Sequence, residues 1–324
     1  MKKISLVDLL FEDVEDDIET AFNAGPAAVR KLADTTSDKE ELKNALKGDH
    51  DKVVPDDKIP VGGDASVSVG GLIPTQNEID LMKSVAFPLG GFKALKQMVT
   101  SKTIGAPGSI TISGNEVLDG HHRWSSVWGI AGPTGTISTQ DVDLPGGTDQ
   151  KLAAAQLAIA AYKDPDTKQP SASDPIPYNI LGKSKDYIKK MILDNVGVQA
   201  DKKAPGPLLN DEMLEQSAQD QAIADWAGFE VGADTETVKD KIADRVAENL
   251  GGAKPIPENP NAPARADMPQ FDHDAIGGKT AKADIYAGLK AGEFNVEPPF
   301  KAESASADGN LVVERWQRLA GLLK

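Results

Sequence analysis

The sequence has 324 residues, a formal net charge of −15 at pH 7 and no cysteine. An acidic surface repels nucleic acid unless a local basic patch overrides it, so the net charge disfavours bulk nucleic acid as a partner. A chain without cysteine has neither disulfides nor thiolate metal sites, so thiol chemistry is excluded. No apolar run reaches the length of a membrane span. We therefore expect no membrane partner, and a location in the cytoplasm or, if the chain is phage-encoded, in a virion.

The length indicates two domains, or one domain with accessory segments, and the mixture of strand-like and helical segments predicts an α+β fold. The expected order is a helical N-terminal segment (1–50), a small mixed domain (51–150), a helical domain (151–250), an extended Pro-rich arm (251–308) and a C-terminal amphipathic helix (309–324).

The N-terminal segment carries apolar residues at helical spacing. An apolar face over residues 4–14 predicts a first helix, a second begins near Pro26, and a third includes residues 42–46. The acidic residues within 12–17 are interpreted as a solvated helix face, rather than a docking face or a metal site, because carboxylates at adjacent positions point in different directions.

The polar stretch at 48–71, punctuated by Pro and Gly, predicts a linker into the mixed domain. Two short strands are expected at 109–112 and 115–118, with a tight turn between them. Apolar residues at helical spacing then run over 124–131 and end at a Gly-Pro pair, a helix stop signal. The local pattern is strand, turn, helix.

The junction between the second strand and this helix reads Leu118-Asp119-Gly120-His121-His122-Arg123-Trp124 and holds two of the four histidines of the chain. Gly120 permits a tight turn, and the free N–H groups in the first turn of a helix can bind an anion. Arg123 adds a forked, permanently charged donor. Asp119, His121 and His122 are side-chain types that move a proton or hold a metal-bound phosphate, so the predicted ligand is a phosphate.

The string Asp-Gly-His-His-Arg at 119–123 resembles the phosphate-binding signature of the ParB/sulfiredoxin superfamily, which includes partition proteins, nucleases, sulfiredoxins and free-serine kinases. The neighbouring segments fit the same order. Residues 69–76 resemble the strand and Pro-containing turn that open the fold, 78–85 its first helix and 135–144 its closing strand. The resemblance covers roughly residues 60–148.

This resemblance implies a nucleotide- or phosphate-binding domain that transfers a phosphoryl group or hydrolyses a phosphodiester or nucleotide, with Mg²⁺ and ATP or ADP as cofactors. Its partner would be a nucleotide or a phosphorylated small molecule. The implied phosphate-binding residues are Gly120, His121, His122 and Arg123; Asp119 is the candidate metal ligand or base, and His121 and His122 are also catalytic candidates.

Two positions depart from the patterns of this superfamily. Sulfiredoxins carry a cysteine after the motif glycine, where this chain has His121. Free-serine kinases carry a glutamate base soon after the first Pro, and the matching position here is Gln76, which cannot accept the substrate proton. Gln76 is therefore a candidate phosphate-binding residue, and Glu78 is the candidate substitute base.

Beyond the mixed domain, apolar spacing predicts helices at 150–162, 183–196, 209–227 and 234–250. The tetrapeptide Phe271-Asp272-His273-Asp274 contains metal-ligand types, but we interpret it as a polar loop anchored by its phenylalanine. Two carboxylates and one histidine bind no metal without distant partners.

A competing interpretation is a non-catalytic structural or assembly protein, for example a phage virion component, that uses a ParB-like domain as a scaffold. Its partners would be protein chains bound through the terminal helices and the Pro-rich arm. If these motif residues have no functional role, His121 and His122 form a polar helix start satisfied by neighbouring carbonyls, and Trp124 and Trp128 pack in the core at positions i and i+4.

Overall fold

The computed structural model describes residues 14–36, 39–47, 58–104, 109–162, 178–252, 262–271, 278–298 and 300. The chain forms two compact units, each built from segments that are separate in the sequence. We call residues 1–61, 144–170 and 269–324 the helical unit, and residues 62–143 and 171–268 the sheet unit. Helices and a five-stranded mixed sheet confirm the predicted α+β class.

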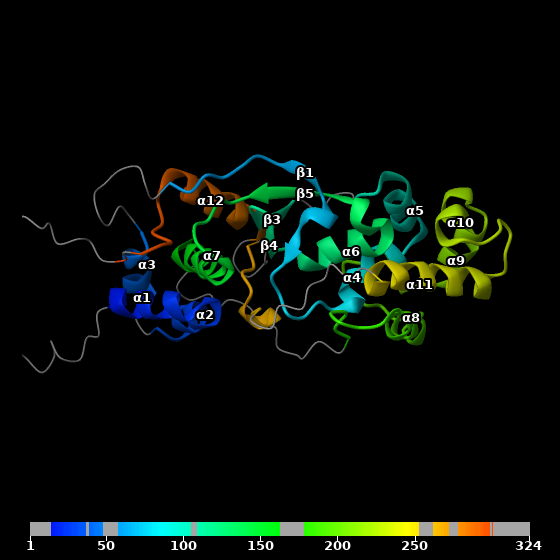
Figure 1. The fold of residues 1–324 in the computed structure, drawn as a ribbon, viewed down its shortest axis with the longest axis horizontal. Helices are drawn as coiled ribbons and strands as arrows, with labels where there is room; N and C mark the ends of the chain where they lie inside the picture. Colours follow the sequence, from blue (N-terminus) through cyan, green and yellow to red (C-terminus); the bar gives the residue numbers. More distant parts are fainter. Residues whose placement is uncertain are drawn as a thin grey trace, which may run out of the picture. The chain divides into compact units, whose positions relative to one another are not determined.

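The described helices of the helical unit are α1 (Val14–Ala24), α2 (Pro26–Thr35), α3 (Lys39–Ala45), α7 (Thr148–Tyr162) and α12 (Gly278–Ala291). Helix α7 is apolar on all sides and buried from Leu152 to Ala161, because α1, α2, α3 and α12 all contact it (Figure 1). The predicted helix at 150–162 is confirmed. It packs with the N-terminal helices.

The extended conformation predicted for 251–308 is wrong at residues 278–291, where α12 forms. Ile285 and Leu289 are fully buried one turn apart, and Tyr286 lies against the buried Phe271 ring with 5.7 Å between ring centroids. This apolar spacing is helical, and the neighbouring prolines concealed it. The predicted helices at 4–13 and 309–324, and residues 272–274 of the Phe-Asp-His-Asp loop, lie outside the described residues.

The sheet of the sheet unit has the order β1-β5-β3-β4-β2. Its strands are β1 (Ala65–Ser68), β2 (Ile73–Pro74), β3 (Ile110–Ser113), β4 (Glu116–Asp119) and β5 (Thr136–Asp141). The pairs β1–β5 and β3–β4 are antiparallel, whereas β3–β5 and β2–β4 are parallel. The predicted hairpin and the strand after the motif helix are confirmed. The linker predicted at 48–71 is wrong at 65–68, where the exposed edge strand β1 lacks the apolar alternation that would have marked it.

The helices of the sheet unit are α4 (Leu81–Leu89), α5 (Phe92–Ser101), α6 (His121–Ala131), α8 (Lys185–Asp194), α9 (Asp211–Ala218), α10 (Gln221–Ala227) and α11 (Thr235–Gly252), with short 3-10 turns at 69–71, 132–134 and 265–267. Helix α6 is central because β3, β5, α4, α5 and α11 all contact it (Figure 1). Trp124 and Trp128 are fully buried on α6 with ring centroids 5.2 Å apart, so their predicted core packing is confirmed.

Side-chain caps move two helix boundaries away from the predicted ones. The helix expected at 78–85 begins at Leu81, because the Asp80 carboxylate accepts the N–H of Met82 and stops the helix from extending further back. The helix expected at 209–227 is divided into α9 and α10, because Asp220 caps α10 by accepting the N–H groups of Ala222 and Ile223.

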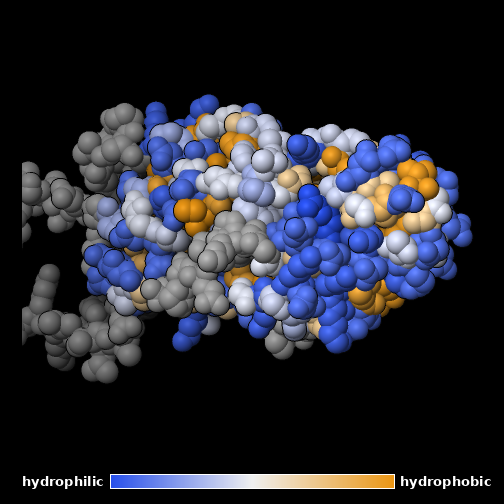
Figure 2. Space-filling model, turned by 45° about the vertical axis from the view of Figure 1, so that its right-hand side comes forward, coloured by the Kyte–Doolittle hydropathy of each residue, from blue (hydrophilic) through white to orange (hydrophobic). Residues whose placement is uncertain are grey.

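The surface of the described residues is mainly hydrophilic on the face seen in Figure 2, with apolar residues in separate patches. Large exposed apolar side chains include Ile73, Val198 and Val231, which come from three different segments. Within the described ranges, no helix is both long and apolar enough to cross a membrane.

Gly120 is the position where this fold depends most directly on glycine. It has φ +101°, and an added Cβ would overlap the Ile110 side chain. Gly114 also has a positive φ, +62°, but nothing lies within 4 Å of an added Cβ. We expect Gly114→Ala to lower the free energy of unfolding by about 1 kcal/mol from backbone strain alone, and Gly120→Ala by about 3 kcal/mol because overlap adds to strain.

Urea unfolding followed by tryptophan fluorescence measures this difference, since Trp124, Trp128 and Trp226 lie in the sheet unit. Equal losses in the two variants would show that Ile110 yields freely to the added methyl group.

Candidate functional site

The motif occupies the junction where β4 ends and α6 begins. Asp119 is the last residue of β4, Gly120 turns the chain in a left-handed conformation, and His121 starts the helix. The carbonyl of Gly120 accepts the N–H groups of Arg123 at 2.9 Å and Trp124 at 3.0 Å. The strand, turn, helix pattern therefore presents the side chains of His122 and Arg123 from the first turn of α6.

His121 ties α6 to the segment that follows β2. Its imidazole is buried, and its Nε2 accepts the N–H of Thr75 at 3.1 Å. Burial lowers the pKa of His121 to about 3, so the ring is neutral at pH 7. A neutral ring that accepts at Nε2 carries its proton on Nδ1. His121 and His122 both accept main-chain N–H groups through Nε2, whereas the interpretation of the two histidines as a simple polar helix start expected neighbouring carbonyls as their partners.

His122 is half-buried beside the start of α4, and its Nε2 accepts the N–H of Asp80 at 3.4 Å. Burial holds the pKa of His122 well below its ordinary value, and the positive charges of Arg265, Lys83 and Arg123 lower it further. His122 is therefore neutral at pH 7, with Nδ1–H as its remaining donor.

A cavity of about 410 Å³ lies beside the first turns of α6. Its lining combines four kinds of group: the cations Lys83, Arg123 and Lys203, the carboxylate of Asp201, the polar His122 and Ser126, and the apolar Ala86, Phe87, Ile104 and Ala204. Lysine, arginine and histidine donors beside apolar walls are typical of sites that bind an anion attached to an organic group.

The three cations come from distant parts of the chain. Lys83 is half-buried on α4, and burial together with the charge of Arg265 lowers its pKa, against the opposing effect of Asp80 and Asp201. Arg123 is half-buried on α6, and its Nη1 donates to the carbonyl of Ser109 at 3.3 Å. That hydrogen bond orients the guanidinium at the cavity.

Lys203 belongs to the loop between α8 and α9. The ends of this loop are closed by main-chain hydrogen bonds, Gly197 N–H to the Leu208 carbonyl at 2.8 Å and Leu208 N–H to the Val198 carbonyl at 3.0 Å. The loop crosses the α4–α5 turn at Gly206, which lies against the backbone of Gly90. A Cβ added to Gly206 would stand 2.8 Å from the carbonyl oxygen of Gly90, so glycine permits this close approach. This close approach brings the loop onto the cavity.

Ser126 is the lining residue whose environment is least expected. Its side chain is 4% exposed, and its hydroxyl has no hydrogen-bond partner among the described residues. The hydroxyl of the preceding Ser125 is fully buried too, but it lies 2.7 Å from the Ser84 hydroxyl and donates to the His122 carbonyl at 3.2 Å. Two adjacent buried serines thus differ in hydrogen bonding, and the unpartnered one lines the cavity.

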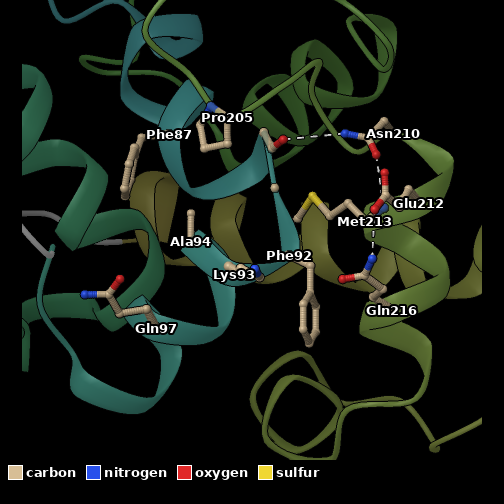
Figure 3. Close-up of a pocket in the computed structure, with 12 residues that line it drawn as sticks. Phe87, Phe92, Lys93, Ala94, Gln97, Pro205, Asn210, Glu212, Met213 and Gln216 are labelled. Carbon is tan, nitrogen blue, oxygen red and sulfur yellow. Dashed lines mark hydrogen bonds between the residues drawn. The ribbon is translucent and has the colours of Figure 1, made fainter.

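A second cavity, of about 460 Å³, lies between α5 and α9. Figure 3 shows Asn210, Glu212 and Gln216 along one side of it and Phe87 and Gln97 on the other. Its charged lining residues, Lys93 and Glu212, have opposite signs, and none of the unpartnered buried polar atoms of the described residues lines it. The smaller cavity beside α6 is therefore the better candidate site.

The other predicted site residues do not line the cavity beside α6. Asp119 is half-buried at the end of β4. Gln76 is buried, and its side-chain amide donates to the carbonyl of Glu78, which is half-buried in the loop before α4. The structure thus brings together His122 and Arg123, and places Asp119, His121, Gln76 and Glu78 around them in supporting segments. Among the described residues, no three His, Asp or Glu side chains lie together as a metal site.

Sequence reasoning missed Lys83, Ser126, Asp201 and Lys203. Ser126 had a local signal, since it follows the motif and interrupts the apolar residues of the helix. Lys203 had none, because its loop lies some eighty residues after the motif and has no pattern of its own.

No family model, curated protein or solved structure matches this chain.

The depressed pKa of His121 gives the stability of the sheet unit a definite pH dependence. Between the unfolded value of about 6.5 and the folded value of about 3, the unfolded chain binds a proton that the folded ring does not. The free energy of unfolding therefore falls as pH decreases below 6.5, by about 1.4 kcal/mol per pH unit for each such histidine.

His121→Gln keeps an acceptor for the Thr75 N–H but removes the titration. Between pH 6.5 and pH 5 we expect wild type to lose about 2 kcal/mol more than this variant, measured by urea unfolding at several pH values. His122→Gln should show an effect of the same sign. Parallel stability curves for wild type and both variants would contradict the neutral state of these rings.

Proposed function

We propose that the sheet unit binds a nucleotide or another phosphorylated small molecule in the cavity beside α6. The observation that carries this proposal is the convergence of Lys83, Arg123 and Lys203 on one cavity in a chain of net charge −15. These three cations, placed together by α4, α6 and a distant loop, outnumber the one carboxylate of the lining, Asp201, so an anionic ligand would lower their mutual repulsion.

Each polar lining group suits phosphate in a different way. The Arg123 guanidinium offers paired N–H donors that match two phosphate oxygens, whereas the lysines act as mobile point charges. The positive end of the α6 dipole adds to this field, because Arg123 lies in the first turn. Neutral His122 supplies an uncharged donor through Nδ1–H. Ala86, Phe87 and Ile104 then offer an apolar wall for the organic part of the ligand.

We further propose that residues 60–148 form a ParB/sulfiredoxin-like domain. The Asp-Gly-His-His-Arg string, its position between a hairpin and a helix, and the strand that follows the helix support this assignment. A phosphate seat at the start of α6 is what that superfamily implies for Gly120, His122 and Arg123.

Phosphoryl transfer, or hydrolysis of a nucleotide or phosphodiester, needs a base and in most such enzymes Mg²⁺, which neutralises charge on the phosphates. Asp119, the predicted metal ligand, and Glu78, the predicted base, do not line the cavity, so these residues do not match the implied catalytic arrangement. The geometry therefore supports binding more directly than catalysis.

Calorimetric titration with ATP, ADP and CTP, in Mg²⁺ and in chelator, tests the binding function. We expect saturable binding by wild type, and a loss of affinity of about 10- to 100-fold in Arg123→Ala, because a charge-assisted hydrogen bond contributes about 1.5–3 kcal/mol. Lys203→Ala should weaken binding about tenfold. Lys202→Ala is the matched control, since Lys202 is exposed on the same loop and does not line the cavity.

Far-ultraviolet circular dichroism establishes that each variant is folded. Equal affinities in Lys202→Ala and Lys203→Ala would remove the loop from the site. A folded wild-type protein that binds neither these three nucleotides nor simpler phosphates, such as inorganic phosphate and ribose 5-phosphate, would overturn the proposed function and favour the assembly interpretation.

A further inference from the structure

The hydroxyl of Ser126 lacks the hydrogen bond that a serine within a helix usually makes. A serine in the middle of a helix commonly donates to the carbonyl four residues earlier, and for Ser126 that carbonyl belongs to His122. Ser125 already donates to it, at 3.2 Å. The Ser126 hydroxyl is left buried and without a hydrogen-bond partner among the described residues, at the wall of the cavity.

Buried hydroxyl groups without a partner are rare in native proteins, because their desolvation is not offset. An alanine at this position would fill nearly the same volume without that cost. A serine here is explained physically if something inside the cavity hydrogen-bonds to it when the site is filled.

The charge of the lining limits the anion that can fill the site. Three cations and the single carboxylate of Asp201 give a formal net charge of +2. Outside the lining, Arg265 and Asp80 act on the pKa of Lys83 with opposite signs. A phosphate monoester carries about −1.5 to −2 at pH 7, which matches the lining, whereas a nucleoside triphosphate without Mg²⁺ carries an excess of negative charge.

We propose that the ligand is a phosphate monoester whose organic part carries a hydrogen-bonding group, and that Ser126 recognises that group. This inference rests on the proposed function. The phosphate lies with Arg123 and the lysines, and the organic part lies between Ser126 and the apolar wall of Ala86, Phe87 and Ile104. Ser126 is then a specificity-determining residue, and the cations supply affinity that is common to all phosphates.

The first experiment compares ligands on the wild-type protein. Calorimetric titrations in chelator, without Mg²⁺, use inorganic phosphate, the four ribonucleoside 5′-monophosphates, ribose 5-phosphate and the matching triphosphates. We expect at least one monoester to bind tenfold or more tightly than inorganic phosphate, and more tightly than its triphosphate. Tighter binding of the triphosphates, or binding of inorganic phosphate alone, would overturn the monoester inference while leaving the proposed phosphate site in place. Binding of none of these compounds would instead defeat the proposed function itself.

The second experiment uses the two serines as a matched pair, with the best monoester as the probe. Ser126→Ala should weaken monoester binding about threefold to tenfold, leave binding of inorganic phosphate unchanged, and leave the unfolding midpoint of the free protein unchanged or raised. Ser125→Ala removes a hydroxyl that is already bonded to Ser84 and His122, so it should lower the unfolding midpoint and leave affinity unchanged.

Two results would overturn the role of Ser126. Unchanged monoester affinity in Ser126→Ala would show that water, and not the ligand, satisfies the hydroxyl. An equal loss for monoester and inorganic phosphate would place Ser126 with the phosphate instead of the organic part. In Arg123→Ala both ligands should weaken together, which identifies the phosphate end of the site independently.

Discussion

The hydrogen bond from the Thr75 N–H to the neutral imidazole of His121 is the constraint on which the sheet unit depends most. His121 and His122 accept main-chain N–H groups at the two ends of the short segment from Thr75 to Asp80. The first turn of α6 therefore fixes the path of the chain from β2 into α4, and α4 carries Lys83 to the cavity. Both imidazole rings can accept these hydrogen bonds only while they are neutral, and burial keeps them neutral.

The tryptophans hold the helical part of the sheet unit against α6 by a similar combination of burial and main-chain hydrogen bonds. The indole N–H of Trp128 donates to the Asn249 carbonyl at 3.0 Å, and that of Trp226 donates to the Ile130 carbonyl at 2.8 Å. The amide of Asn249 donates in turn to the Gly129 carbonyl at 2.8 Å. Because α8 and α9 pack on α11, these bonds also place the loop that carries Lys203.

The sequence was informative where a structural cause is local. The hairpin, the turn at Gly120 and the length of α6 follow from neighbouring residues, so they could be predicted, as could the placing of His122 and Arg123 on one helical turn. Lys203 reaches the site only because Gly90 and Gly206 let two backbones meet, and no local pattern records such a meeting. The same limit applies to α7, whose sequence predicts a buried helix but not the partners that bury it.

The division of the chain into interleaved segments has a consequence for the order in which the protein folds as it is made. Phe22 of α1 packs edge-on against Phe300, with 5.4 Å between ring centroids, and Lys47 pairs with Phe294. At about 5–20 residues per second on the ribosome, the first helices wait on the order of tens of seconds for these partners to emerge. Helix α7 emerges earlier and can cover part of their apolar surface, but the surface of α1 that packs on Phe300 stays open to chaperones and to other nascent chains during that delay. The productive folding of the N-terminal helices is therefore sensitive to the rate of translation.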